Sequence, residues 1–599
     1  EAALAAARMG HKVALLAINV DKIAHMPCNP SIGGIGKGQL VREIDALGGE
    51  MGRNIDRSMV QIKTLNRSKG PAVQALRAQA DRRKYSWLMK RKILEEPGLT
   101  LRQAEVIELI KAGEEEFLLK VADGRDVLVG RVIVATGTFL KGVLAMGSSS
   151  YPGGRAGEMP SNEISASLGR LGIELGRFQS ATPPRVLAHS VAREKMSIQP
   201  GDPEPVRFSF ESPRRKVRQR DCYLTYTGKK THDVITKNLH LSPIKSGSVS
   251  AKGPRYCPSI ERKVLNFPDR QRHPVFVEPE GWQNHELYLQ GLTTSMPVAV
   301  QEKIIQSVAG LEEAIIIRPG YAVSYDYVLP YQLKSTFECV SQPGLYTAGQ
   351  INGTSGYEEA AAQGLLAGIN AALSCEGKKP LVLERSQAYI GVLTDDIVTK
   401  ESDEPYRMFT SRAEHRLLLR SDNADARLTS IGHSLGLISD ERMRKITKRQ
   451  AEIRACLARL ESTSISLLDI DIAIPKDMSK NESARAIALL KRPEVSIEQL
   501  KPILRLGGFS REVRRQVEIE AKYEGYIKRQ KEQIAAQKRL EKTSLPAFDY
   551  ESIGALSNEA RQKLTKIKPQ SLGQAARIQG VTPADISILM IHLEQCQRT

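Results

Sequence analysis

Two cysteines lie in sequence surroundings that favour thiolate chemistry. Cys28 opens the loop CNPSIGGIGKG, and Cys257 lies in GPRYCPSIERK. Arg255 precedes Cys257, and Arg262 and Lys263 follow it closely, so nearby positive charge would stabilise its thiolate. Both cysteines are therefore candidate nucleophiles. Each could instead be a small buried side chain, which is the commoner role of a single cysteine.

A glycine-rich turn in LYTAGQINGTSGYEEA is the second feature that could do chemistry. Gly349, Gly353 and Gly356 would let a ligand approach the backbone and leave amide groups free at the start of a helix. That arrangement suits a flat, anionic cofactor. The glycines around Lys37 predict a second loop over the cofactor. A P-loop is disfavoured there, because Gly38 stands where Ser or Thr is needed.

Three segments predict the scaffold, a doubly wound, Rossmann-like α/β sheet. EAALAAAR has small residues on every face of a helix, and the strand HKVALLAIN follows it, as in the second half of a β-α-β unit. RVIVAT and LYTAG supply two more strands that run into glycine turns. We expect the opening strand, with its GxGxxG turn, to precede residue 1. The alternative is a free-standing N-terminal helix.

Changes of composition along the chain predict a domain organisation. We expect the sheet domain in two parts, 1–185 and 320–380, with an inserted α/β domain at 186–319. A basic connecting segment at 381–434 leads to an all-helical region at 435–599, where apolar positions recur three and four residues apart. The predicted fold class is thus an α/β sheet with an inserted α/β domain and a helical C-terminal domain.

The composition restricts the class of protein and its partners. The 599 residues are 41% hydrophobic and 26% charged, as in an ordinary globular protein, and no apolar run is long enough to span a membrane. Seven cysteines without a CxxC pair argue against a disulfide framework or a zinc site and favour a reducing cytoplasm. The net charge of +19 fits either general solubility or a polyanionic partner.

Two basic stretches are candidates for contact with a polyanion. NRSKGPAVQALRAQADRRKY, at 66–85, is predicted to place its Lys and Arg around one helix, as a solvated face or as a surface for phosphates. EPYRMFTSRAEHRLLLRSDNADARL, at 404–428, interleaves arginines with Tyr406, Phe409 and His415. Arginines among aromatic rings suit unstacked RNA bases.

Together, several motifs resemble the MnmG (GidA) family, the FAD-dependent tRNA uridine 5-carboxymethylaminomethyl modification enzymes. They extend over nearly the whole chain and include CNPSIGGIGKG, SKGPAVQALRAQADR, GPRYCPSIERK, AGQINGTSGYEEAAAQGLLAG and EPYRMFTSRAEHRL. The resemblance implies a cytoplasmic homodimer that binds FAD and uses NADH as reductant. With the GTPase MnmE, in a heterotetramer with a dimer of each protein, it would add a carboxymethylaminomethyl or aminomethyl group to carbon 5 of the wobble uridine of tRNA. Methylenetetrahydrofolate would supply the carbon, and the helical C-terminal domain would dock MnmE.

The resemblance also implies roles for single residues. Cys28 and Cys257 match the family's two functionally important cysteines, and either could attack carbon 6 of the uridine or carry the one-carbon unit. Val106, Ser161 and Gln350 match contacts to FAD, with Val106 expected at the end of a strand, and Gly349 belongs to the turn described above. The stretch 253–267 matches the segment assigned to NAD, in which Arg262 stands where relatives can have an acidic residue. Its members are Gly253, Pro254, Arg255, Tyr256, Cys257, Pro258, Ser259, Ile260, Glu261, Arg262, Lys263, Val264, Leu265, Asn266 and Phe267.

Two alternatives to this function stay open at this point. A folate- and FAD-dependent tRNA uridine methyltransferase would also use a cysteine, but it would not need a docking domain after residue 435. A non-catalytic, basic nucleic-acid-binding scaffold with a vestigial flavin fold would show no turnover that depends on tRNA.

Overall fold

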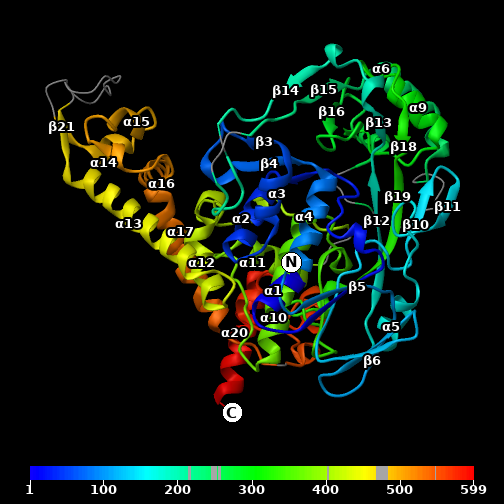
Figure 1. The fold of residues 1–599 in the computed structure, drawn as a ribbon. Helices are drawn as coiled ribbons and strands as arrows, with labels where there is room; N and C mark the ends of the chain where they lie inside the picture. The colour runs from blue at the N-terminus through cyan, green and yellow to red at the C-terminus, as the bar shows by residue number, and fades with distance from the viewer. Residues whose placement is uncertain are drawn as a thin grey trace.

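The structure is a computed structural model that describes the chain apart from residues 205, 214–216, 244–252, 254–257, 401–403, 467–482, 547 and 599. It has a broad α/β body and a projecting arm (Figure 1). The arm holds α13 (Asp440–Ser462) and α16 (Arg511–Lys522), while the C-terminal helix α20 (Pro583–Arg598) lies back beside the body.

Parallel strands form the centre of the body, as predicted. β1 (Val13–Ala17) pairs in parallel with β5 (Leu99–Gln103), and β9 (Val132–Val134) pairs in parallel with β20 (Leu345–Thr347). The four strands form two separate ladders rather than one sheet. β1 is only half-buried, although a buried strand is expected here, because a cavity lies along it.

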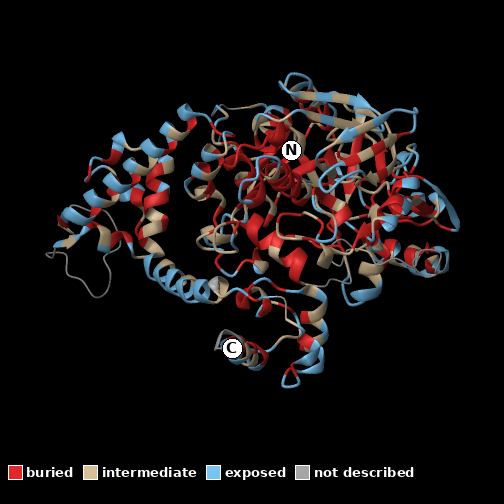
Figure 2. Ribbon diagram, turned by 90° about the horizontal axis from the view of Figure 1, so that it is seen from below, coloured by how far each residue is buried: buried red, intermediate tan, exposed pale blue. Residues whose placement is uncertain are grey.

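Small residues bring the two central helices close together. α10 (Tyr357–Cys375) packs on α1 (Ala2–Arg8), and a Cβ at Gly368 would lie only 2.4 Å from the carbonyl oxygen of Ala2. α1 ends at Arg8 with Met9 as its C-cap, and Gly10 follows with a φ of +94°, a conformation that glycine adopts without strain. The predicted helix is confirmed. Buried residues are concentrated around these helices (Figure 2).

Antiparallel sheets and further helices enclose this centre. β7 (Phe117–Val121) and β8 (Asp126–Val129) form a hairpin whose turn includes Gly124, with φ +86°. The three sheets, each in spatial order, are β2 (Ser31–Gly33), β4 (Ala75–Ala80) and β3 (Met59–Leu65); β6 (Val106–Lys111), β7 and β8; and β11 (Ser149–Pro152), β10 (Val143–Met146), β19 (Tyr321–Val328) and β12 (Leu175–Thr182). The accompanying helices are α2 (Lys37–Ala46), α3 (Met51–Ser58), α4 (Arg82–Leu94), α5 (Glu163–Arg170), α11 (Tyr389–Thr399) and α12 (Ala424–Ser434).

The segment predicted as an inserted α/β domain has a sheet and a core of its own. Val277, Leu289 and Ile304 are among the buried residues of that core. The antiparallel sheet runs, in spatial order, β14 (Ser197–Gln199), β15 (Cys222–Tyr226), β16 (Pro274–Pro279), β17 (Glu286–Gln290), β13 (Arg185–Leu187) and β18 (Ile316–Arg318). The helices are α6 (Lys229–Lys237), α8 (Ile260–Asn266) and α9 (Val298–Gln306).

Among its described residues, the region after 435 is helical, as predicted, apart from one small ladder. That ladder joins β21 (Ser464–Ser466) to β22 (Ser483–Arg485). Two separate cores lie in this region, one around Leu489 and Val517 and the other around Leu564 and Leu589. The remaining helices are α14 (Ala486–Leu490), α15 (Ile497–Leu500), α17 (Glu524–Lys542), α18 (Asn558–Ile567) and α19 (Leu572–Ala575).

The first basic stretch differs from its predicted form. Residues 66–85 are not one helix, because the strand β4 intervenes before α4 begins at Arg82. In 404–428 two arginines serve the interior: Arg420 is buried, and Arg427 donates to the buried carboxylate of Glu43. Arg416 of this second stretch is exposed, so its contact with RNA stays a prediction.

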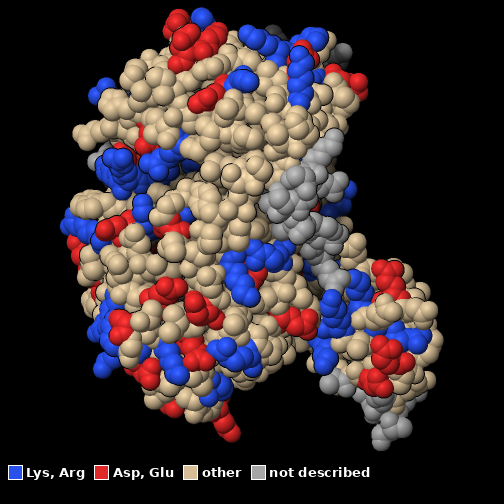
Figure 3. Space-filling model, turned by 90° about the vertical axis from the view of Figure 1, so that its right-hand side faces the viewer, with Lys and Arg blue, Asp and Glu red and all other residues tan. Residues whose placement is uncertain are grey.

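The net charge is dispersed over the face shown in Figure 3, where Lys and Arg are interspersed with Asp and Glu. A basic site must therefore be found from local geometry. Among the described helices, none is both long and apolar enough to cross a membrane.

Candidate functional site

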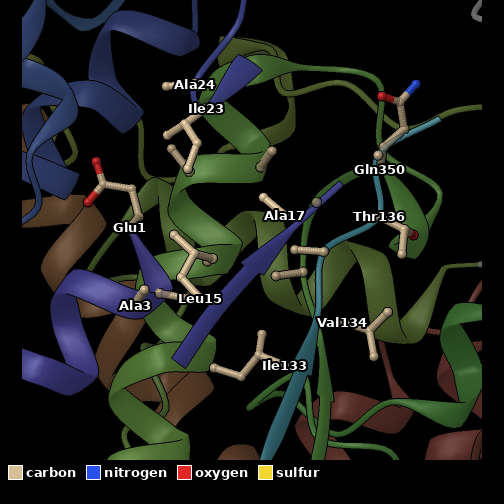
Figure 4. Close-up of a pocket in the computed structure, with 18 of the residues that line it drawn as sticks. Glu1, Ala3, Leu15, Ala17, Ile23, Ala24, Ile133, Val134, Thr136 and Gln350 are labelled. Atoms are coloured by element: carbon tan, nitrogen blue, oxygen red, sulfur yellow. The ribbon is translucent and has the colours of Figure 1, made fainter. Parts of the chain in front are cut away.

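A cavity of about 1160 Å³ runs between the two parallel ladders of the body. Leu15 and Ala17 on β1 and Ile133 and Val134 on β9 line it (Figure 4). Ligand pockets of proteins usually measure roughly 300–1,000 Å³. The space is therefore large enough for an extended cofactor.

The predicted glycine-rich turn closes one end of this cavity. Gly349 and Gly353 have φ of +89° and +74°, and Gly356 precedes the first turn of α10. The start of α10 lines the cavity, so the partial positive charge of the helix N-terminus faces it. Gln350 also lines the cavity and donates to the hydroxyl of Tyr325, at 2.8 Å from Nε2 to Oη.

The lining of this cavity fits a flavin dinucleotide. The apolar strand residues suit flat rings, and the start of α10 suits anionic or electron-rich groups. Thr136 lines the cavity, and its buried Oγ1 has no hydrogen-bond partner among the described residues. A buried hydroxyl without a partner is costly, so the atom points to a bound ligand.

The structure brings the predicted FAD contacts together. Val106, Ser161, Gly349 and Gln350 all line the one cavity, although they come from distant parts of the chain. Val106 begins β6 rather than ending the preceding strand, because β5 stops at Gln103. Ser161 is buried and its amide donates to the carbonyl of Phe139 at 2.9 Å.

Cys28 lines the same cavity, in the loop between η1 (Val20–Lys22) and β2. Its Sγ lies 3.7 Å from the carbonyl oxygen of Ala181 and 3.8 Å from the hydroxyl of Tyr288. The thiol therefore sits where the sheet domain meets the inserted domain, within reach of the cofactor cavity.

Buried charges hold the Cys28 loop. Arg185 donates to the carbonyl oxygens of Pro27 at 2.7 Å and of Cys28 at 2.8 Å, and its guanidinium lies over the ring of Tyr288. Glu280 pairs with both Arg185 and Arg82 at 3.2 Å. Two arginines thus share one carboxylate, and net positive charge remains beside the Cys28 loop.

The same buried charges act on two neighbouring groups. Burial opposes the charge of Arg185, but Glu280, with Tyr288 and Cys28, outweighs it and raises the pKa of the guanidinium. For His25, burial and then the cations Arg82 and Arg155 lower the pKa to about 3. His25 is therefore neutral at physiological pH.

Sequence reasoning missed a second charged cluster at the cavity wall. The Nζ of Lys37 lies 3.1 Å from Glu358 and 2.9 Å from Glu359, at the start of α10. Burial would lower the pKa of Lys37, but the two carboxylates outweigh burial and raise it. Glu358 also accepts from the amide of Gly33 at 2.7 Å, so the predicted glycine loop is joined to α10. The only sign of this cluster in the sequence was Lys37, which stands in a glycine run without the Ser or Thr of a P-loop.

Comparison with protein families decides which family this fold and site represent. The family described as "Glucose inhibited division protein A" matches residues 1–379. Two family models of the tRNA modifying enzyme MnmG/GidA, for its C-terminal helical domain and its C-terminal helical bundle, match residues 440–531 and 533–599. The chain belongs to the MnmG/GidA family.

Relatives of this family match over at least 95% of their own length. The tRNA uridine 5-carboxymethylaminomethyl modification enzyme MnmG of Caldicellulosiruptor saccharolyticus is 50% identical, covering 100% of this chain and 96% of that protein. The enzyme of the same name from Heliobacterium modesticaldum is 49% identical over 100% of this chain and 95% of that protein. The solved structure of Aquifex aeolicus GidA matches with a TM-score of 0.90 and 42% identity, covering 99% of this chain and 96% of that one. This match confirms the predicted fold class and the recognised family.

The segment expected to contact NAD lies mostly apart from the cavity of this MnmG/GidA member. Pro254, Arg255, Tyr256 and the candidate nucleophile Cys257 lie outside the described residues. Pro258 and Ser259 lead into α8, which spans Ile260, Glu261, Arg262, Lys263, Val264, Leu265 and Asn266, with Phe267 as its C-cap. Ile260 is buried in the core of the inserted segment, and the buried Glu261 accepts from the hydroxyl of Thr294. None of the described residues from 258 to 267 lines the cavity.

Proposed function

We propose that this chain is an FAD-dependent enzyme that modifies carbon 5 of the wobble uridine of tRNA. The observation that carries the proposal is the single cavity that combines Cys28, the glycine turn at α10 and the four predicted FAD contacts. The family relatives, named as tRNA uridine 5-carboxymethylaminomethyl modification enzymes over the full length of the chain, support the same activity. The compartment proposed is the cytoplasm.

FAD would be held by residues of the cavity lining. Val106 would offer backbone groups to the adenine, Ser161 and Gln350 would make polar contacts, and Gly349 would allow close approach of the backbone. The Thr136 hydroxyl would gain the partner that it lacks. When bound, FAD would supply two-electron transfer, while the apolar strand residues exclude water from its rings.

The Cys28 thiolate would act as a nucleophile toward the uridine. Addition of its thiolate to carbon 6 forms a C–S bond and moves the C5–C6 π electrons to carbon 5, which makes carbon 5 nucleophilic. Loss of the carbon 5 proton after substitution returns those electrons and releases the thiolate. Cys257 is the second proposed thiol, and either cysteine could instead carry the one-carbon unit.

The finer features of the reaction rest on the resemblance to the family. We propose NADH as reductant, methylenetetrahydrofolate as carbon donor, a homodimer, and MnmE as partner of the helical C-terminal region. For NADH, the position of Gly253 at the start of the matched segment supports the proposal. Gly253 lies against Gln179 on β12, since a Cβ added at Gly253 would be 3.2 Å from Nε2 of Gln179. Ser180, the next residue, lines the cofactor cavity.

The visible spectrum of the FAD-loaded protein, recorded without oxygen before and after NADH, tests the proposal. The measurement uses the 599-residue chain loaded with FAD. We expect NADH to bleach the flavin band. The Cys28→Ser variant should bleach equally, because the thiol acts on the uridine rather than on the cofactor.

Each outcome discriminates among the candidate functions. Bleaching followed by tRNA modification that requires MnmE supports the proposal. Flavin binding without bleaching removes the NADH assignment of 253–267 and favours the methyltransferase. Absence of any turnover with tRNA, MnmE, NADH and the folate donor would favour the scaffold.

A further inference from the structure

A second cavity, of about 300 Å³, lies behind the Cys28 loop and is not used by the cofactor site. We call it the Lys22–Trp87 pocket. It is lined by Asp21, Lys22, His25, Arg82, Arg83, Ser86, Trp87, Lys90 and Arg318. Lys22 and His25 line the cofactor cavity as well, so one loop forms a wall between the two spaces.

One face of α4 forms the floor of this pocket. Arg82, Ser86, Trp87 and Lys90 follow the spacing that places residues on the same side of a helix. The loop is fastened to that face: Lys90 pairs with Asp21 at 2.6 Å, and Arg82 donates to the carbonyl of Met26 at 3.4 Å. The pocket and the Cys28 loop are therefore parts of one rigid unit.

The pocket is positively charged. Its lining has five cations and one carboxylate, Asp21. Glu280 and Glu286, from the inserted segment, pair with Arg82 and Arg318 at 3.2 and 2.9 Å. Neither Lys22 nor Arg83 forms a salt bridge within the part of the chain that the structure describes, and two positive charges therefore remain for an anion.

An aromatic ring stands at the rim of the pocket. Trp87 is 56% exposed, which is unusual for so large an apolar side chain. The guanidinium of Arg91 lies 5.8 Å from its ring. An exposed ring beside unpaired cations is the combination that binds single-stranded nucleic acid, through base stacking and phosphate contacts.

We propose that the Lys22–Trp87 pocket binds one phosphodiester and one unstacked base of the tRNA anticodon loop, next to the nucleotide presented to Cys28. This inference rests on the proposed function. At about 30 Å³ per water, the cavity has the volume of roughly ten waters, enough for a phosphate group with part of its sugar. Cys28 follows His25 by three residues, so the extended chain between them spans at most about 11 Å. A backbone held in the pocket would thus lie beside the thiol.

Binding of a 17-nucleotide anticodon stem-loop RNA, with an unmodified wobble uridine, tests this pocket in the FAD-loaded full chain. The variant is Lys22→Gln with Arg83→Gln. The matched control is Lys229→Gln with Lys230→Gln on the exposed face of α6, which removes the same total charge. We expect the pocket variant to weaken binding at least tenfold. Its slope of log affinity against log salt should fall by about 1.4, at about 0.7 per lost contact to a single strand. The control should keep the slope of the unaltered protein.

Trp87 supplies a second, independent readout. RNA should quench its fluorescence, and Trp87→Ala should weaken binding roughly tenfold, whereas Trp87→Phe should retain part of the affinity because a ring remains. The flavin absorbance of every variant verifies its fold.

Two results would overturn the inference, and they are distinguishable. If the unaltered chain binds and modifies tRNA while the Lys22 and Arg83 variant keeps its affinity and salt slope, the pocket alone is wrong. If the unaltered chain binds flavin but no RNA, the proposed function falls together with the pocket.

Discussion

At the scale of single residues, the setting of Cys28 depends on charges that the sequence keeps far apart. Arg82, Arg185 and Glu280 come from different elements and meet only in the folded protein. Because Glu280 is shared, it cannot neutralise both arginines. Burial, and then the positive charge of Arg82 and Arg155, lowers the pKa of His25 and keeps this histidine neutral.

Replacement of Cys28 tests its role directly. Cys28→Ser is expected to reduce tRNA modification by several orders of magnitude, since serine is far less nucleophilic at neutral pH. Flavin binding should be unchanged. Cys375→Ser is the control, because Cys375 is exposed and also lines the cofactor cavity. If Cys28→Ser and Cys257→Ser both modified tRNA normally, thiol chemistry would be excluded.

The lowered pKa of His25 predicts how the free energy of unfolding depends on pH. The unfolded chain protonates this histidine near a pKa of about 6.5. In the folded protein its pKa is about 3. The unfolded state therefore binds more protons between these values, so the free energy of unfolding falls as pH decreases from about 6.5 toward 3. Relative to His25→Gln, the unaltered protein should lose about 2 kcal/mol between pH 7 and pH 5.

Urea unfolding of both proteins at the two pH values measures this difference. The unaltered protein should show the larger decrease in its midpoint. Equal decreases would mean that His25 is not buried as a neutral group.

At the scale of elements, the turn before α10 is where sequence and structure agree best. Its glycines were recognisable because an apolar strand, a run of small residues and a helix start stand in a row. By contrast, the helix predicted over 66–85 was wrong. The basic residues there were expected around one helix, yet pairing of β4 with β2 and β3 determines the backbone. Such pairing is a long-range contact that local periodicity does not contain.

Gly349→Ala tests the role of that turn. Gly349 has φ +89°, and an added Cβ would lie 3.1 Å from the Cβ of Ala360. A left-handed backbone costs a residue with Cβ roughly 1–2 kcal/mol. The variant should therefore lose stability and bind FAD more weakly in an absorbance titration.

Gly377→Ala is the matched control. Its φ is +64° and an added Cβ would contact nothing within 4 Å, so it carries similar backbone strain away from the turn. It should lose a comparable amount of stability but bind FAD normally. Equal affinities of both variants would show that Gly349 does not face the cofactor.

At the scale of the whole molecule, the described residues form four large hydrophobic cores that are separate from one another. The last of them lies in the helical bundle and meets the body through Arg577, which pairs with Asp395 at 2.8 Å. None of the described residues of this bundle lines the cofactor cavity. Flavin binding and docking of the partner should therefore be separable.

Deletion of residues 544–599 tests that separation. The shortened chain is expected to keep the flavin spectrum and its bleaching by NADH. Its tRNA modification in the presence of MnmE should fall to background, because the proposed docking surface is gone. Arg577→Gln, which loosens the bundle without removing it, should give an intermediate activity. Loss of flavin from the shortened chain would show that the bundle supports the body instead.

The sequence by itself determined the fold class, the glycine turn and the family, and it predicted residues that line the one cavity, Cys28 among them. Each of these features depends on a short run of neighbouring residues, such as glycines that allow a left-handed backbone or a motif of fixed spacing. Only the tertiary structure decided that Lys37 joins two glutamates, that Arg420 and Arg427 serve the interior, and that Trp87 and Lys22 share a pocket. Each of these depends on contacts between distant segments, where burial and pairing of charges outweigh local pattern.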